Sequence, residues 1–272
     1  MNLSCAQFSC TGTRDSNQDA LGYTISDDYA CFVVSDGVSG EPGSEVAARC
    51  AVERILERAQ RSGPTLAPIR EPFRAPIREP ALGETLLACI EEAHGAILAS
   101  QQRERERGRM SATVIALFID RRHNIAQWAH LGDSRLYRFA RGALIERTRD
   151  HSVRQQLLDA GLPSEGVNPG WLHMALGMRG PIAPAISPPH ALEDGDVFLL
   201  CTDGLWQTVA QEALEDRLRI VHTVDDWALL IEHEAMRHSG SAPNADNYSA
   251  LAVWAGSPQN VTLQRARTRR EE

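Results

Sequence analysis

The chain has 272 residues, of which 43% are hydrophobic, and its formal net charge at pH 7 is −8. This length allows one large domain or two small ones, and the hydrophobic content excludes global disorder. No apolar stretch approaches the roughly 20 residues that span a bilayer, and the N-terminus lacks a secretory signal, so no membrane span and a cytoplasmic location are expected. The negative charge argues against a nucleic-acid partner.

Arginine supplies all 28 basic residues, and lysine is absent. Genomic codon bias is the simplest cause of this absence. The absence nevertheless excludes P-loop, kinase and Schiff-base chemistry that depends on a lysine. Any bound anion must therefore be held by arginine, a metal or the backbone. The six cysteines show no CxxC spacing, and several fall within apolar runs, which favours buried, reduced thiols.

The hydrophobic pattern predicts strands, two helices, further strands, further helices and a last strand. In chain order we expect two strands over residues 21–36, helices at 43–61 and 82–103, strands at 113–119, 125–130, 134–139 and 143–148, a helix at 151–160, a strand at 196–202, helices at 208–218 and 224–238, and a strand at 248–254. Antiparallel strands with helices inserted between them predict a layered α+β fold, which we expect to form one domain over residues 1–255.

Three segments fall outside this regular pattern. Residues 64–80 contain Ala-Pro-Ile-Arg-Glu-Pro twice and five prolines, which predicts an extended, solvated insertion; a proline-rich docking site is the alternative. Residues 161–190 are rich in glycine and proline, and irregular loops of this length are usually functional or mobile. Residues 256–272 are expected to be a disordered tail.

Four aspartates carry most of the chemical information, in the motifs Asn17-Gln18-Asp19, Ser35-Asp36-Gly37, Thr202-Asp203-Gly204 and Asp246-Asn247. Two of these motifs end continuous apolar runs, which are typical of strands buried on both faces. Carboxylates brought together at strand ends repel one another unless a hard cation such as Mg²⁺ or Mn²⁺ lies between them. A single Asp-Gly pair is equally well explained as a turn, but the whole set is not.

Convergence of these strand ends would create a site for phosphate-ester hydrolysis. Asp36, Asp203 and Asp246 would hold two divalent cations, which lower the pKa of a bound water and place it in line with a phosphoryl group. Arg14, five residues before Asp19, offers a planar guanidinium for the phosphate oxygens. The alternative for Arg14 is a surface salt bridge.

The sequence resembles the metal-dependent serine/threonine protein phosphatases of type 2C (PPM class). Eight short segments match that family in order, at residues 12–19, 34–40, 111–113, 129–135, 149–152, 175–177, 195–205 and 246–247. Each segment alone is a weak signal, but eight in order are specific. The resemblance implies a four-layer α-β-β-α sandwich, with two antiparallel sheets flanked by helices, and a flap beside the active site at 161–190.

The resemblance also implies a metal centre for Mn²⁺ or Mg²⁺. Asp36 would bridge two metals, the Gly37 carbonyl would bind one of them, and Asp203 and Asp246 would ligate the same pair. Asp133, together with Asp203, would hold a third, weaker metal, as in bacterial members.

Two further roles are implied outside the metal ligands. Asp19 would hydrogen-bond metal-bound waters, and Arg14 would clamp the substrate phosphate. Many members have a glutamate where this chain has Gln18, which puts metal affinity in doubt. Eukaryotic members have a histidine where this chain has Val38, so the leaving-group proton must come from water or another group. His130 and His151 are expected to make structural hydrogen bonds.

The expected function is that of a stand-alone bacterial phosphatase, a monomer, which hydrolyses phosphoserine and phosphothreonine in proteins and opposes a serine/threonine kinase. Two alternatives stay open: a pseudophosphatase that acts as a binding module, and a hydrolase of small phosphate esters. The sequence does not identify the substrate, the kinase or the pathway. A link to type VI secretion is only an association with some compact members.

Overall fold

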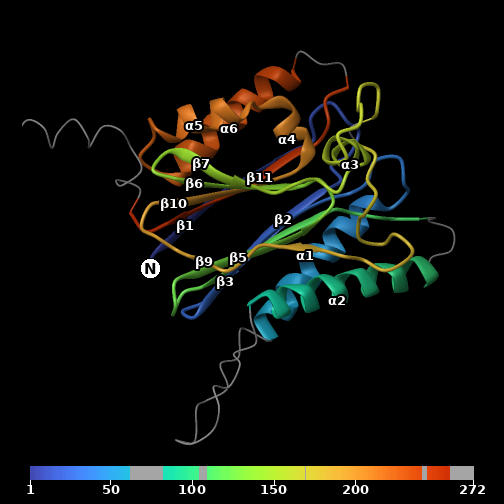
Figure 1. Ribbon diagram of the computed structural model, residues 1–272, viewed down its shortest axis with the longest axis horizontal. Coiled ribbons are helices and arrows are strands. Elements are labelled where there is room, and N and C mark those ends of the chain that lie inside the picture. Colours follow the sequence, from blue (N-terminus) through green and yellow to red (C-terminus); the bar gives the residue numbers. More distant parts are fainter. Residues whose placement is uncertain (62–81, 104–108, 169, 241–243, 258–272) are drawn as a thin grey trace, which may run out of the picture.

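The computed structural model describes residues 1–61, 82–103, 109–168, 170–240 and 244–257. The predicted insertion at 64–80 and the predicted tail beyond residue 257 lie outside these residues. Figure 1 shows four layers, in which two sheets face each other and helices cover both outer faces. The predicted α+β sandwich is confirmed by this arrangement.

The two sheets are antiparallel throughout. The first has the order β1 (Leu3–Cys10), β11 (Tyr248–Ala255), β10 (Asp196–Cys201), β6 (Arg135–Ala140) and β7 (Ala143–Arg147). The second has the order β2 (Asp19–Ile25), β3 (Tyr29–Asp36), β4 (Val114–Asp120), β5 (Ile125–Leu131) and β8 (Ala185–Ile186), and β9 (His190–Ala191) also pairs with β5.

The helices form the outer layers. Those outside the second sheet are α1 (Ser44–Arg61) and α2 (Leu82–Arg103), and those outside the first are α4 (Asp203–Thr208), α5 (Gln211–Leu218) and α6 (Val224–Ser239). A short helix, α3 (Val153–Asp159), follows β7. None of the helices in the described ranges is long and apolar enough to cross a membrane.

The central strands are apolar on both faces because each face packs in a different core. In β10, Phe198 and Leu200 lie in the core between the sheets, whereas Val197 and Leu199 lie in the core under α5 and α6. Strands β3, β4 and β11 alternate in the same way. Strands covered on both sides show no polar alternation, which explains the continuous apolar runs in the sequence.

Besides the two-residue strands β8 and β9, which lie in or next to the segment expected to be irregular, two elements were not predicted. Strand β1 is a sheet edge with alternating half-buried and exposed residues, and its many small and polar side chains gave no strong strand signal. Helix α4 begins directly after β10, where the Asp203-Gly204 pair is typical of a turn. The predicted helix at 208–218 starts only at Gln211, because Val209 and Ala210 are extended.

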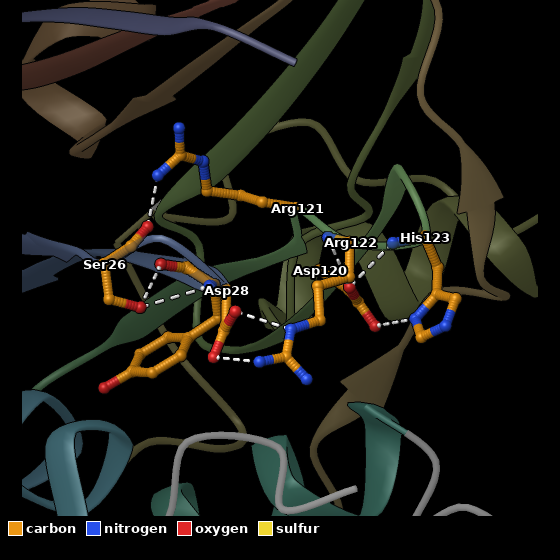
Figure 2. Close-up of polar contacts among 7 residues, drawn as sticks. Ser26, Asp28, Asp120, Arg121, Arg122 and His123 are labelled. Carbon is orange, nitrogen blue, oxygen red and sulfur yellow. Dashed lines mark hydrogen bonds and ion pairs between the residues drawn. The ribbon is translucent and has the colours of Figure 1, made fainter.

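Two neighbouring turns are joined by charged side chains at one end of the second sheet, which we call the hairpin end (Figure 2). The Arg122 guanidinium contacts the Asp28 carboxylate through two nitrogens, at 2.5 and 2.6 Å. Asp120 accepts hydrogen bonds from the backbone N–H groups of Arg122 and His123, both at 2.9 Å, and its other oxygen faces His123 Nδ1 at 2.8 Å. Asp28 and Asp120 therefore each have a basic side chain beside them.

The six cysteines are all free thiols, which agrees with the expectation from their spacing. Cys31, Cys89 and Cys201 are buried in the apolar cores.

Candidate active site

The opposite end of the sandwich brings the predicted aspartates together. Strand β2 begins at Asp19 and β3 ends at Asp36, and these two residues are direct partners in the antiparallel register. The pairing continues one step further, where Gly37 N–H donates to the Gln18 carbonyl at 3.1 Å. Directly opposed residues in an antiparallel pair have Cα atoms roughly 4.5–5.5 Å apart, so the two carboxylates repel each other.

Asp203 and Asp246 come from the other sheet. Asp203 opens α4 just after β10, and Asp246 precedes β11, the neighbour of β10. A Cβ atom at Gly204 would lie 2.0 Å from the Asn247 carbonyl oxygen, and one at Gly37 would lie 2.7 Å from the backbone of Ser44. Neither glycine has a positive φ. Glycine is therefore required after each aspartate because the neighbouring chain packs so closely, and not because of a turn conformation.

A cavity of about 350 Å³ opens between these segments. Six of the seven residues predicted from the sequence line it, namely Arg14, Asp36, Gly37, Asp133, Asp203 and Asp246. The seventh, Asp19, does not line the cavity: its Oδ2 accepts a hydrogen bond from Thr202 Oγ1 at 3.0 Å, and its Oδ1 is buried without a partner in the described part of the chain.

Burial and mutual repulsion raise the pKa of four carboxyl groups here. Burial, opposed by the nearby hydroxyl groups of Ser249 and Thr202, raises the pKa of Asp19 to about 7. Burial, with the charge of Asp246 next in importance, raises the pKa of Asp203 to about 6. The pKa values of Asp36 and Asp133 lie well above their usual range, first because of burial and then because of the neighbouring aspartates.

Arg14 lies at the edge of the cavity, with its side chain 43% exposed, and its Nη2 donates to Asp246 Oδ2 at 2.8 Å. Its loop is held by Asn247, whose amide donates to the carbonyls of Thr11 and Ser16 at 2.8 and 3.0 Å. Asn247 Oδ1 also accepts from Gln18 N–H at 2.8 Å. Asn247 belongs to the Asp246-Asn247 motif, but no local sequence pattern predicts this role for it.

Supporting contacts around Asp36 and Asp133 were also missed. Thr113 Oγ1 accepts from the Asp36 N–H at 3.0 Å and lies 2.6 Å from Ser134 Oγ, which ties the end of β3 to the turn that carries Asp133. Trp206 Nε1 donates to the Asp133 carbonyl at 2.9 Å. The family motifs contain most of these residues, but no local pattern predicts contacts across such sequence distances.

Part of the segment at 161–190, for which a flap is predicted, lies beside this cavity. Asn168, Gly170, Trp171 and Leu172 line the cavity. Trp171 is 60% exposed, and its carbonyl accepts from Val153 N–H at 2.8 Å. An exposed tryptophan beside a charged cavity offers an apolar contact surface to a bound chain.

His130 and His151 make contacts inside the fold, as expected for structural residues. His130 Nε2 lies 2.7 Å from the Arg149 carbonyl, and His151 Nδ1 accepts from Gly132 N–H at 3.3 Å. Their rings stack at 4.7 Å, and His173 lies beside His151 at 5.6 Å. Burial lowers the pKa of His130 and lowers that of His151 to about 4, so both rings are neutral near pH 7.

The donor atoms fit a hard divalent cation. Carboxylate and carbonyl oxygens are the ligands that Mg²⁺ and Mn²⁺ prefer. A cation would offset both the burial and the mutual repulsion that raise the pKa values of these carboxyl groups. The partnerless oxygen of Asp19 is a further sign of a missing polar contact. Within the described ranges no three acidic, histidine or cysteine side chains are arranged to hold an ion unaided. Mg²⁺ commonly keeps several water ligands and does not need a cage made only of protein groups.

Comparison with known proteins identifies the family. A family model described as protein phosphatase 2C matches residues 7–239. The serine/threonine phosphatase Stp of Listeria monocytogenes is 27% identical over 247 residues, covering 88% of this chain and 90% of that protein.

Solved structures of serine/threonine phosphatases are also similar to this chain. The crystal structure of the Mycobacterium tuberculosis serine/threonine phosphatase PstP/Ppp is 25% identical, with a TM-score of 0.75 and coverage of 93% of this chain and 99% of that one. The PstP catalytic domain in complex with two manganese ions is 24% identical, with a TM-score of 0.74 and coverage of 94% and 99%, a likeness of fold. The fold and the family predicted from the sequence are confirmed, and the chain belongs to the protein phosphatase 2C family.

Proposed function

We propose that this chain is a metal-dependent protein phosphatase, which hydrolyses phosphoserine and phosphothreonine in proteins with water activated by Mn²⁺ or Mg²⁺. The observation that carries the proposal is the convergence of Asp36, Asp203 and Asp246 with Arg14 on one cavity. Membership of the protein phosphatase 2C family supports the same activity.

In this proposal four groups would hold two cations: the carboxylates of Asp36, Asp203 and Asp246, and the carbonyl of Gly37. Asp133, which also lines the cavity, holds a third ion together with Asp203. The bound ions supply a water of lowered pKa and neutralise charge on the phosphoryl group. The manganese ions in the PstP structure support the choice of metal.

Asp19 orients water at the metal centre. Its carboxylate is fixed by Thr202 Oγ1 on one oxygen, which leaves the second oxygen as an acceptor for water. Gln18 contributes two backbone hydrogen bonds and no charge. Its backbone carbonyl accepts from Gly37 N–H, and its backbone N–H donates to Asn247 Oδ1.

Arg14 binds the phosphoryl oxygens. Only its Nη2 is engaged, on Asp246, so Nε and Nη1 make no hydrogen bond to any described residue and are free to donate to a ligand. A guanidinium presents donors in a planar fork that matches a phosphate. Arg14 therefore connects the metal ligand Asp246 to the substrate.

The proton for the leaving alkoxide comes from solvent water. Val38 stands where eukaryotic members have a histidine, and it cannot carry a proton. The nearest histidines of the motifs, His130 and His151, are occupied by contacts inside the fold and are neutral near pH 7.

Further details of this function rest on the family alone. We expect a cytoplasmic monomer that opposes a serine/threonine kinase. The rival functions are a binding module without turnover and a hydrolase of small phosphate esters, and neither is favoured by a specific contact.

One assay separates the three functions. Metal-stripped protein is supplied with Mn²⁺, and phosphate release is measured from a phosphothreonine peptide and from p-nitrophenyl phosphate. The proposal predicts Mn²⁺-dependent release with a higher kcat/KM for the peptide. Turnover of the small ester alone would identify the small-molecule hydrolase, and binding of the peptide without turnover of either compound would identify the binding module.

A further inference from the structure

A second cavity, of about 220 Å³, lies beside the active-site cavity. It is formed by the end of β7, the start of α3 and the face of α4 that carries Trp206. Its polar lining is dominated by arginine, with Arg135, Arg147 and Arg154 against the single carboxylate of Asp150. We call it the arginine cavity.

The carboxylate of Asp150 is already paired with Arg135 inside the fold. Arg135 donates to both of its carboxylate oxygens, from Nε at 2.8 Å and from Nη2 at 2.7 Å, and the two side chains are only 12% and 9% exposed. The Arg135 guanidinium also lies 3.5 Å above the centre of the Trp206 ring, which is a cation–π contact. This pair forms a fixed wall of the cavity and leaves no free negative charge in it.

Arg147 and Arg154, in contrast, have no carboxylate partner among the described residues. Both are exposed, and neither makes an ion pair or a side-chain hydrogen bond to any residue that the structure describes. Two guanidinium groups therefore face a cavity with no carboxylate left to pair with them. Because the chain contains no lysine, arginine is the permanently charged side chain available for an anion here.

The two cavities have no lining residue in common, but neighbouring residues line them. Helix α4 contributes Asp203 and Gln207 to the active-site cavity and Trp206 to the arginine cavity. Ser152 lines the arginine cavity and pairs by its backbone with Leu172, which lines the active-site cavity. A chain bound at the active site can therefore reach the arginine cavity with a neighbouring residue.

We propose that the arginine cavity binds a second phosphoryl group on the same substrate chain, so that substrates phosphorylated at two nearby residues are preferred. This proposal rests on the proposed function, because it assigns a subsite to that reaction. A phosphoryl group carries a charge of about −1.5 to −2 and three acceptor oxygens, which match two guanidinium forks better than a single carboxylate does. No chemical step takes place in the arginine cavity.

The test compares phosphothreonine peptides that carry, at a second position, phosphoserine, glutamate or serine. An extended chain advances roughly 3.3–3.6 Å per residue, so spacings of about two to six residues sample the distance between the cavities. For the best spacing we expect the doubly phosphorylated peptide to have a KM about tenfold lower than the serine peptide. Inorganic phosphate is added in a separate arm to detect a site for the free anion.

The double substitution Arg147→Gln and Arg154→Gln should abolish this preference and leave kcat and KM for the serine peptide unchanged. Arg49→Gln is the matched control, because Arg49 is an exposed arginine of α1 outside both cavities. A preference that survives in the double variant, or its absence at every spacing in the unaltered protein, would overturn the proposal. An equal gain from glutamate, or a site filled by inorganic phosphate alone, would also overturn it.

A binding measurement separates this proposal from the proposed function. Fluorescence anisotropy with the same labelled peptides, using Asp36→Asn protein, reports affinity without turnover. Tighter binding of the doubly phosphorylated peptide, lost when Arg147 and Arg154 are also replaced, supports the arginine cavity even if the unaltered protein hydrolyses neither peptide. Equal binding of the two peptides overturns it even if hydrolysis is rapid.

Discussion

The second sheet carries aspartates at both of its ends, and the side chains around these aspartates differ between the two ends. At the hairpin end, Asp28 is paired with Arg122 and Asp120 lies beside His123 (Figure 2). At the active-site end, Asp19 and Asp36 face each other across β2 and β3, and Arg14, which lines the same cavity as Asp36, pairs with Asp246 instead. The same residue type is neutralised at one end and crowded at the other.

This difference separates a structural role from a functional one. The Asp28–Arg122 pair is about half exposed, and such pairs contribute roughly 0–1 kcal/mol to stability. Raising the pKa of Asp19 from 3.8 to about 7 costs on the order of 4 kcal/mol when the group is ionised above that pH. A bound cation would offset this cost of burying charged carboxylates, as the proposed metal site requires.

The largest effect is expected at the centre of the crowded end. Asp36→Asn should lower kcat at least about 100-fold, a barrier increase of roughly 2.7 kcal/mol, because an amide lacks the charge that shares two cations. The metal-free protein should melt at a higher temperature, because repulsion with Asp19 and Asp203 is relieved. Retention of more than about a tenth of the rate would show that Asp36 does not bridge the cations.

The pH dependence of the metal-free protein should show the same crowding. The folded pKa values of Asp19 and Asp203, about 7 and about 6, exceed the unfolded value of 3.8, so the folded state binds more protons between these limits. Their contribution to stability is present at low pH and is lost as the pH rises through 6 and 7. Asp19→Asn should therefore stabilise the metal-free protein, by roughly 2 kcal/mol at pH 8 and little at pH 4.5.

The measurement is chemical denaturation in EDTA at several pH values, with the difference between the two proteins as the readout. The difference cancels the contribution of His151, whose lowered pKa makes stability fall as the pH drops below about 6.5 toward 4. A stabilisation by Asp19→Asn that is the same at pH 4.5 and pH 8 would contradict the assignment of charge to Asp19.

A moderate effect is expected at the rim of the same end. Arg14→Lys keeps the positive charge but loses the planar fork, so kcat/KM for a phosphothreonine peptide should fall about tenfold. Affinity for Mn²⁺, measured by calorimetry, should stay close to that of the unaltered protein. A large loss of Mn²⁺ affinity would instead place Arg14 in the support of the Asp246 carboxylate.

The smallest effect is expected at the hairpin end. Asp28→Asn removes the pair with Arg122 and should lower the free energy of unfolding by less than about 1 kcal/mol. Its kcat and its Mn²⁺ affinity should not change, because no residue of the hairpin end lines either cavity. A loss of activity at this distance would mean that the two ends are coupled through the sheet.

Sequence alone predicted the crowded end well, for a physical reason. Strands β3 and β10 are covered on both faces, so their apolar runs are continuous, and the polar residue that ends each run is conspicuous. The hydrophobic pattern by itself therefore places Asp36 and Asp203 at strand ends. Asp133 came only from the family resemblance, because its turn carries no such signal.

What sequence missed depends on contacts between distant segments. Asn247 holds the Arg14 loop from more than 230 positions away, and Trp206 links Asp133 to the arginine cavity. The pairing of Arg14 with Asp246 is of the same kind. Local propensity and periodicity do not predict contacts between distant segments. The edge strand β1 was missed for the same reason, because its partner β11 lies at the other end of the chain.

The central claim is that the crowded end of the sandwich binds divalent cations and the hairpin end does not. Calorimetric titration of Mn²⁺ into the metal-stripped protein at pH 7.5 tests it directly. We expect at least two ions per chain with release of protons from the carboxyl groups of raised pKa, the same result for Asp28→Asn, and loss of the tight sites in Asp36→Asn. Equal stoichiometry and affinity in Asp36→Asn and in the unaltered protein would contradict the claim.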